Sequence, residues 1–125
     1  MAFGKFAKDV LMNEMESRIA YVGTGHDDGS VFTETAGAPY TRQPVSFGSS
    51  FEGSIAQVAN ATIPIPAGET ISWVVFYDAQ TLGNVIAFEA ITPQLFSNDG
   101  TVTVDSSTTL DLNGLEEYNS IPTGL

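Results

Sequence analysis

The sequence predicts an all-β fold, an antiparallel β-sandwich of about seven or eight short strands with one amphipathic helix at its N-terminus. A jelly roll is one arrangement of strands that would fit this prediction. Short runs rich in β-branched and aromatic residues are separated by turn signals every ~8–12 residues. Apolar residues at helical spacing occur only near the N-terminus of the sequence. We therefore divide the chain into an N-terminal helix (1–17), a β-sandwich domain (18–112) and a C-terminal tail or arm (113–125).

The best-defined element is a hairpin in the middle of the chain. Two apolar runs, Ile71–Tyr77 and Val85–Ile91, flank the turn-forming stretch D-A-Q-T-L-G-N. Side chains alternate between the two faces of a strand. Strict alternation places Ile71 with Trp73, Val75 and Tyr77, opposite Val74 and Phe76. Because both faces carry large apolar groups, the first run is expected to be a central strand.

The N-terminal segment predicts an amphipathic helix over about Lys5–Ser17. Its apolar residues recur at helical spacing: Phe3, Phe6, Ala7, Val10, Leu11 and Met15. A short helix gains most of its stability from packing. The stripe therefore packs either on its own domain or on a neighbouring subunit, and the sequence leaves both open.

Shorter segments fill the rest of the sandwich. A strand over Arg18–Gly23 is expected to lead into the polar loop T-G-H-D-D-G-S, and Pro93 is expected to bend the chain after the hairpin. The remaining expected strands are Val31–Pro39 (weak edge), Tyr40–Ser46 (broken at Pro44), Ser54–Ile65 (a pair or one bent strand), Thr101–Asp105 and Thr108–Leu112. The tail from Asn113 is either a flexible end or an arm that orders on a partner.

The charge is strongly acidic. Four Lys and Arg residues oppose 15 Asp and Glu residues, giving a net charge of −11, and no basic residue follows Arg42. Such a surface repels phosphate backbones and anionic lipids, so nucleic-acid and membrane partners are not expected. The 42% hydrophobic content is typical of a folded domain.

Other features of the sequence limit the classes of protein to which it can belong. Without cysteine there is no disulfide, thiol chemistry or Cys-based metal site. No apolar run reaches the ~18 residues of a membrane span. The first residues lack the uninterrupted apolar core of a signal peptide, so we expect a soluble protein made in the cytoplasm.

Chemistry-bearing patterns are sparse. His26 is the single histidine, beside Asp27 and Asp28, and it could serve a hydrolase or a cation site, although adjacent loop residues rarely converge on one ion. Trp73 and Tyr77, with the loop acids, could form a sugar-binding platform, although such clusters are more often core. Gly23-Thr24-Gly25 resembles part of a phosphate loop but lacks its lysine. We expect no catalytic residue, cofactor or metal.

The order of the segments resembles a family of small phage virion proteins often labelled "phage tail fibre protein", found in phages of actinobacteria and related hosts. The matching stretches are His26-Asp27-Asp28-Gly29, Tyr40-Thr41-Arg42, Pro66-Ala67-Gly68-Glu69-Thr70-Ile71, Phe76-Tyr77-Asp78-Ala79 and Gly83-Asn84. The likeness covers about residues 1–114. It departs from the family at Tyr77, where the family has Trp, in the loop order around His26, and in the acidic tail.

The resemblance implies a non-enzymatic structural protein of the virion. A capsid decoration protein is our leading expectation, because the chain has one domain and no fibrous repeat; a tail or tail-fibre protein and a carbohydrate-binding module are the alternatives. The expected partners are the major capsid protein or tail proteins, and further copies in a homo-oligomer, preferably a trimer. Arg42 is expected to pair with a carboxylate, inside the subunit or between subunits. The candidate interface residues are Phe3, Phe6, Val10, Leu11, Arg42, Tyr118 and Ile121.

Overall fold

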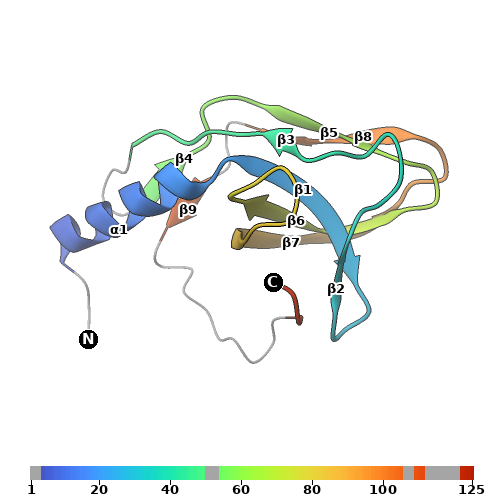
Figure 1. The fold of residues 1–125 in the computed structure, drawn as a ribbon, viewed down its shortest axis with the longest axis horizontal. Helices are drawn as coiled ribbons and strands as arrows, with labels where there is room; N and C mark the ends of the chain where they lie inside the picture. Colours follow the sequence, from blue (N-terminus) through green and yellow to red (C-terminus); the bar gives the residue numbers. More distant parts are fainter. Residues whose placement is uncertain (1–3, 50–53, 106–108, 112–121) are drawn as a thin grey trace.

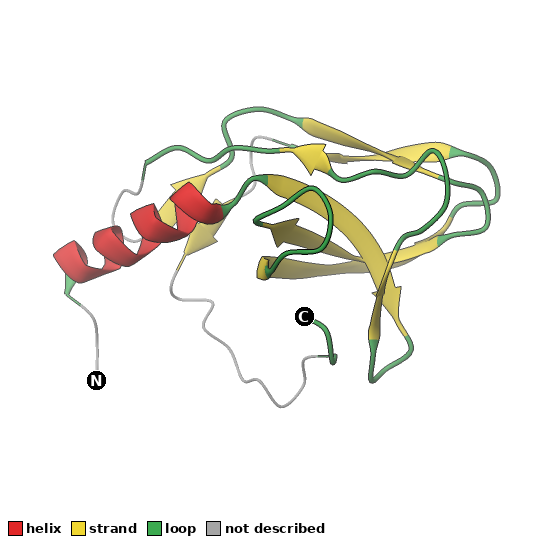
Figure 2. Ribbon diagram, in the orientation of Figure 1, coloured by secondary structure: helices red, strands yellow, loops and turns green. Residues whose placement is uncertain are grey.

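The computed structural model describes residues 4–49, 54–105, 109–111 and 122–125, and it confirms an all-β sandwich with one N-terminal helix (Figures 1 and 2). The helix α1 spans Lys5–Arg18. The strands of the described part are β1 (Tyr21–Asp27), β2 (Phe32–Glu34), β3 (Gln43–Pro44), β4 (Ser54–Ala56), β5 (Ala61–Ile65), β6 (Thr70–Tyr77), β7 (Val85–Leu95), β8 (Gly100–Val104) and β9 (Thr109–Asp111).

The strands form one larger sheet and two small ladders, all antiparallel. The larger sheet has the order β2-β1-β6-β7, and β3 pairs with the first part of β1. The ladders are β4-β9 and β5-β8. In Figure 1 the β5-β8 ladder lies over β1, β6 and β7, which makes two layers. The predicted hairpin is confirmed as β6-β7, and β6 is a central strand.

The hydrophobic core fills the space between the layers. Its buried members come from the helix, the larger sheet and both ladders: Met12, Ile19, Val22, Phe47, Ile55, Ala61, Ile63, Ile65, Ile71, Val74, Phe76 and Val104. The rings of Phe47 and Phe76 meet edge to face at 5.5 Å. Close packing of this kind makes the domain a rigid scaffold for its loops.

The faces of β6 differ from the prediction at one residue. Ile71 joins Val74 and Phe76 in the core instead of lying with Trp73. The reason is a register shift between β6 and β7. Ile71 pairs with Gln94 and Trp73 pairs with Ala90, so two residues of β6 span four residues of β7. Such an irregularity breaks the simple alternation of faces. The strand β7 runs on to Leu95. The chain was predicted to bend at Pro93, and the structure has the register shift there while the strand continues.

One further boundary was predicted wrongly, and one open alternative is resolved. The strand β1 continues through Gly23-Thr24-Gly25 to Asp27, so these residues form neither a loop nor part of a phosphate site. The segment Ser54–Ile65 forms two strands, which is one of the two expected alternatives, and each pairs with a different late strand. In both cases the pairing partner, which lies far away in the sequence, decides the outcome.

The helix packs on its own domain by a face that shares only part of the predicted stripe: Met15 belongs to the stripe, whereas Met12 does not. Met12 is fully buried and Met15 packs against the core, and α1 contacts β4. Three other members of the predicted stripe face solvent: Phe6 is 82% exposed, and Val10 and Leu11 are also exposed. The helix therefore meets its own domain and still leaves an apolar face uncovered by the described residues.

The end of the chain lies against β2. Thr123 forms a parallel bridge with Val31, donates its N–H to the carbonyl of Ser30 and accepts the N–H of Phe32. Pro122 beside it is buried. The last four residues thus lie on their own chain, whereas the sequence predicted a flexible end or an arm that orders on a partner; residues 113–121 of the predicted tail lie outside the described residues.

Candidate functional site

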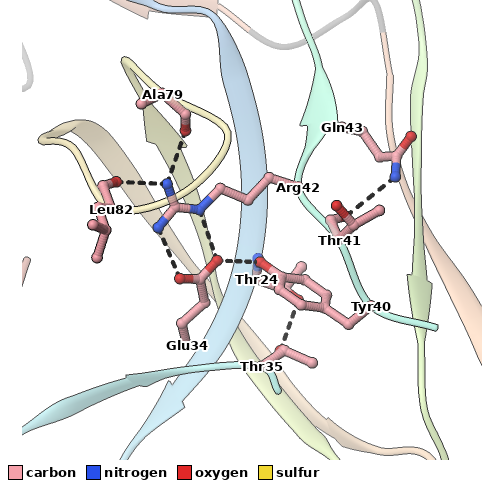
Figure 3. Close-up of polar contacts among 9 residues, drawn as sticks. All are labelled: Thr24, Glu34, Thr35, Tyr40, Thr41, Arg42, Gln43, Ala79 and Leu82. Atoms are coloured by element: carbon pink, nitrogen blue, oxygen red, sulfur yellow. Dashed lines mark hydrogen bonds and ion pairs between the residues drawn. The ribbon is translucent and has the colours of Figure 1, made fainter. Parts of the chain in front are cut away.

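The polar centre of the structure is Arg42, which lies just before β3. Its side chain is 7% exposed. Nε and Nη2 donate to Oε2 and Oε1 of Glu34, each at 2.8 Å, in the two-pronged geometry that suits a guanidinium and a carboxylate. Nη1 donates to the carbonyls of Ala79 and Leu82, each at 2.8 Å (Figure 3). The guanidinium carbon also lies 3.4 Å from the centre of the Tyr77 ring.

We call Glu34, Tyr40, Arg42 and Tyr77 the arginine clamp. The hydroxyl of Tyr40 donates to Oε2 of Glu34 at 2.6 Å and accepts the backbone N–H of Thr24 at 3.2 Å. Burial raises the pKa of Tyr40, and its hydrogen bond to Glu34 raises it further. Burial also raises the pKa of Tyr77 to about 12. Both rings are therefore neutral and fixed over the physiological range.

A glycine of β1 makes room for the clamp. A Cβ at Gly23 would collide with the hydroxyl of Tyr40 and approach Cγ of Arg42 to 3.2 Å. Glycine inside a strand commonly marks such a close approach. Gly23 is thus a site residue, although the sequence analysis considered it only as a strand end and as part of a phosphate-loop pattern. The feature that could have revealed its role is a glycine within a β-rich run.

The clamp holds the loop that connects β6 to β7, residues 78–84. Asp78 closes this loop: Oδ1 accepts the N–H of Asn84 at 2.7 Å and Oδ2 accepts its side-chain amide at 2.9 Å. These bonds lower the pKa of Asp78 below its usual value. Together with the two carbonyl bonds to Arg42, they fix the loop at its base and at its middle.

Leu82 is the unusual residue of this loop. Its backbone has φ +55°, a left-handed conformation that costs energy for a leucine. Its side chain is 87% exposed. Non-glycine residues remain in such conformations when their surroundings impose them, and they are often found at functional sites. Here the bond from Arg42 to the carbonyl of Leu82 supplies the constraint.

A shallow cavity of about 250 Å³ lies between the clamp and this loop, bounded on the loop side by Gln80, Thr81 and Leu82. Its charged groups, Glu34 and Arg42, are bonded to each other. The arrangement can therefore hold a loop rigidly and present uncharged groups to a partner.

The predicted interface residues fall into three groups. Arg42 forms its ion pair inside the subunit, which is one of the two alternatives expected for it. Phe6, Val10 and Leu11 lie on the exposed face of α1. Phe3, Tyr118 and Ile121 lie outside the described residues.

The residues considered for catalysis or ions lie at the end of β1 and in the turn that follows it. His26 lies in β1, and its Nδ1 is buried and makes no hydrogen bond to the described residues. Asp27 accepts hydrogen bonds from Trp73 Nε1 and from the N–H of Gly29, and Asp28 accepts the N–H of Val31. Within the described part of the chain, no three acidic or histidine side chains gather as a metal site.

The residues considered for sugar binding do not form an open platform. Tyr77 is buried beneath the guanidinium of Arg42. Trp73 packs edge to face on Phe88 at 5.6 Å and is half-buried. Tyr77 therefore offers no free face on which a sugar would stack, and the two rings do not form a shared open surface.

The fold and site together define a small β-sandwich protein that carries a rigidly held surface loop. A family model described as "Podophage GP4 fiber I protein gp80" matches residues 19–113, about three quarters of the chain. The chain belongs to this family, and it is a phage fibre structural protein. No curated protein and no solved structure shows a significant match. No helix of the described residues has the length and apolar character needed to cross a membrane.

Three of the five stretches that carried the resemblance meet in space. The step Tyr40-Thr41-Arg42 and the hairpin residues Tyr77, Asp78 and Ala79 meet at the clamp, and Gly83-Asn84 completes the held loop. Sequence reasoning missed Glu34 and Leu82. Glu34 is one of many acids in the sequence, and nothing local distinguishes it.

Proposed function

We propose that this chain is a non-enzymatic subunit of the phage tail fibre, which binds neighbouring tail proteins and other copies of itself in the virion. The family match over residues 19–113 carries this proposal. The rigid loop and the clamp support it, because fixed surfaces lose less conformational entropy on assembly. The acidic surface fits partners other than nucleic acid and anionic membranes.

The capsid decoration role, which the sequence favoured, is the second candidate. The observation in its favour is that this sequence contains no fibrous repeat. In that role the partner would be the major capsid protein. A homo-oligomer, with a trimer preferred, is proposed for either location.

The copy number per purified particle separates the two locations. Quantitative mass spectrometry would compare peptides of this chain with those of the major capsid protein. A small number of copies per particle supports the fibre proposal. A ratio approaching that of the capsid protein contradicts it and supports decoration, and absence from the particle contradicts both.

A further inference from the structure

The two outer edges of the larger sheet differ, because the C-terminal residues cover the edge of β2 and no described strand covers the edge of β7. We propose that residues Pro122–Leu125, which we call the strap, guard the outer edge of β2 and prevent it from pairing with the same edge of a second copy. The inference goes beyond the proposed function, because it concerns a contact that the separate subunit avoids. Copies then assemble through surfaces other than this edge.

The strap lies on β2 as a short added strand in parallel orientation. Thr123 donates its N–H to the carbonyl of Ser30 at 2.7 Å and accepts the N–H of Phe32 at 2.9 Å. An edge strand otherwise leaves such backbone groups free to bond to another chain. Pro122 is buried beside these bonds, and Gly124 has φ +103°, a left-handed conformation that favours glycine. The strap therefore occupies the backbone positions that a partner strand would use.

The stretch under the strap lacks the defences that edge strands usually carry. Charged side chains and prolines keep an exposed edge from pairing. Residues 30–34 read S-V-F-T-E, and the single charge among them, on Glu34, is bonded to Arg42 within the subunit. Val31 is 47% exposed, and its burial would favour pairing once the strap had left. Within residues 30–34, protection of the edge therefore comes from the strap.

The opposite edge of the sheet is protected by its own sequence. β7 is the outer strand on that side. It carries the exposed residues Glu89 and Pro93, and its pairing with β6 contains register shifts. Each of these features hinders the addition of a further strand. This difference identifies the β2 edge of a second copy, rather than its β7 edge, as the partner that the strap excludes.

Two copies of the β2 edge are complementary through their backbones. An antiparallel pair places the N–H groups of each strand opposite the carbonyls of the other, and the same residues serve in both copies. The net charge of −11 on each copy opposes this contact. Salt at physiological strength screens charges that lie more than ~8 Å apart, so the test is made under that condition. The attraction comes from backbone hydrogen bonds and from the burial of Val31, not from charge.

Two variants of the full chain release the strap by different means. Thr123→Pro removes the N–H that bonds to Ser30. Gly124→Val places a β-branched residue at φ +103°, where its backbone is strained. Thr123→Ala is the matched control, since it shortens an exposed side chain and keeps the N–H. Amide exchange at Phe32 reports whether the strap has left, and thermal melting reports whether the domain is still folded.

Sedimentation equilibrium measures how strongly each variant associates. We expect both releasing variants to associate roughly tenfold more strongly than the parent chain, with Phe32 exchange faster by a similar factor, and Thr123→Ala to match the parent. Adding Val31→Lys to Thr123→Pro should return association to the parent value, because a lysine at an edge opposes pairing. Leu95→Lys changes the charge equally at an exposed site on β7 and should leave the association of Thr123→Pro unchanged.

Association of the releasing variants no stronger than that of Thr123→Ala would overturn the inference, and so would unchanged exchange at Phe32. Equal suppression by Val31→Lys and Leu95→Lys would also overturn it, because the contact would then lie elsewhere or depend on charge alone. If neither releasing variant folds, the strap is part of the fold rather than a guard, and the inference fails.

The copy number in the particle is measured independently of these experiments. Failure of the strap inference therefore leaves the proposed function standing, and a copy number that contradicts the fibre proposal leaves the strap inference standing.

Discussion

Replacing Arg42 by methionine tests whether the clamp holds the domain together. Methionine keeps the apolar stem of the side chain and removes the guanidinium. The change removes both bonds to Glu34 and both bonds to the 78–84 loop. Losing one partner of a buried ion pair costs ~3–5 kcal/mol, because the other charge is left without compensation.

The structure places the expected cost at the lower end of that range. The side chain of Glu34 is 30% exposed, so water can solvate its carboxylate in part once Arg42 is gone. The carbonyls of the exposed loop can also bond to water. We therefore expect Arg42→Met to lose about 3 kcal/mol of unfolding free energy, which lowers Tm by about 12 °C for a domain of this size.

Urea and thermal unfolding measure the effect, and Arg18→Met is the matched control. Arg18 pairs with Glu14 on the helix surface, where both side chains are more than 60% exposed. Its loss should cost less than ~0.5 kcal/mol. Glu34→Gln together with Arg42→Met should recover at least ~1.5 kcal/mol of the single loss, because no charge is then left unpaired. An Arg42→Met effect as small as the Arg18→Met effect, or additive losses in the double variant, would refute this account of the clamp.

Three further predictions concern the helix, the loop and the tyrosines. Met12→Ala should cost ~2–4 kcal/mol in urea unfolding and Phe6→Ala less than ~0.5 kcal/mol, because the first is buried and the second exposed; similar losses would mean that the helix docks by its other face. Leu82→Gly should leave Tm unchanged or raise it, since glycine relieves a left-handed backbone that costs leucine ~1–2 kcal/mol; a Tm drop of several degrees would contradict the strain. Tyr77 has a pKa of about 12 when folded and about 10 when unfolded, so the unfolded chain loses its proton first as the pH rises. Its contribution is therefore complete below pH 10 and is lost between about 10 and 12, and Tyr77→Phe should show ~2–3 kcal/mol less loss over that window in urea titrations.

Much of the scaffold could be predicted from local patterns. The hairpin was found because β-branched and aromatic runs flank a turn-rich stretch, and this signal needs no distant partner. The helix was found for a similar local reason. Its packing face was predicted only in part: Met15 of the predicted stripe packs against the core, but the buried Met12 lay outside the stripe. The contact of α1 with β4 cannot be read from the spacing of apolar residues alone.

The site was only partly predictable because it is assembled from distant segments. Arg42 was expected to pair with a carboxylate, and its isolation in an acidic chain made that inference possible. Which carboxylate it meets depends on β2 and β3 both pairing with β1, and this pairing brings Glu34 to the guanidinium. The left-handed Leu82 carries no sequence signal at all, since the usual residues for that conformation are glycine and asparagine.

The position of the protein in the virion tests the central claim most directly. Purified phage particles would be labelled with an antibody against this chain and a gold conjugate, and viewed by electron microscopy. We expect the gold to lie at the fibres of the tail. Gold distributed over the capsid shell would contradict the fibre proposal and favour decoration, and particles without label, when the protein itself is recognised on a blot, would contradict an exposed position in the virion.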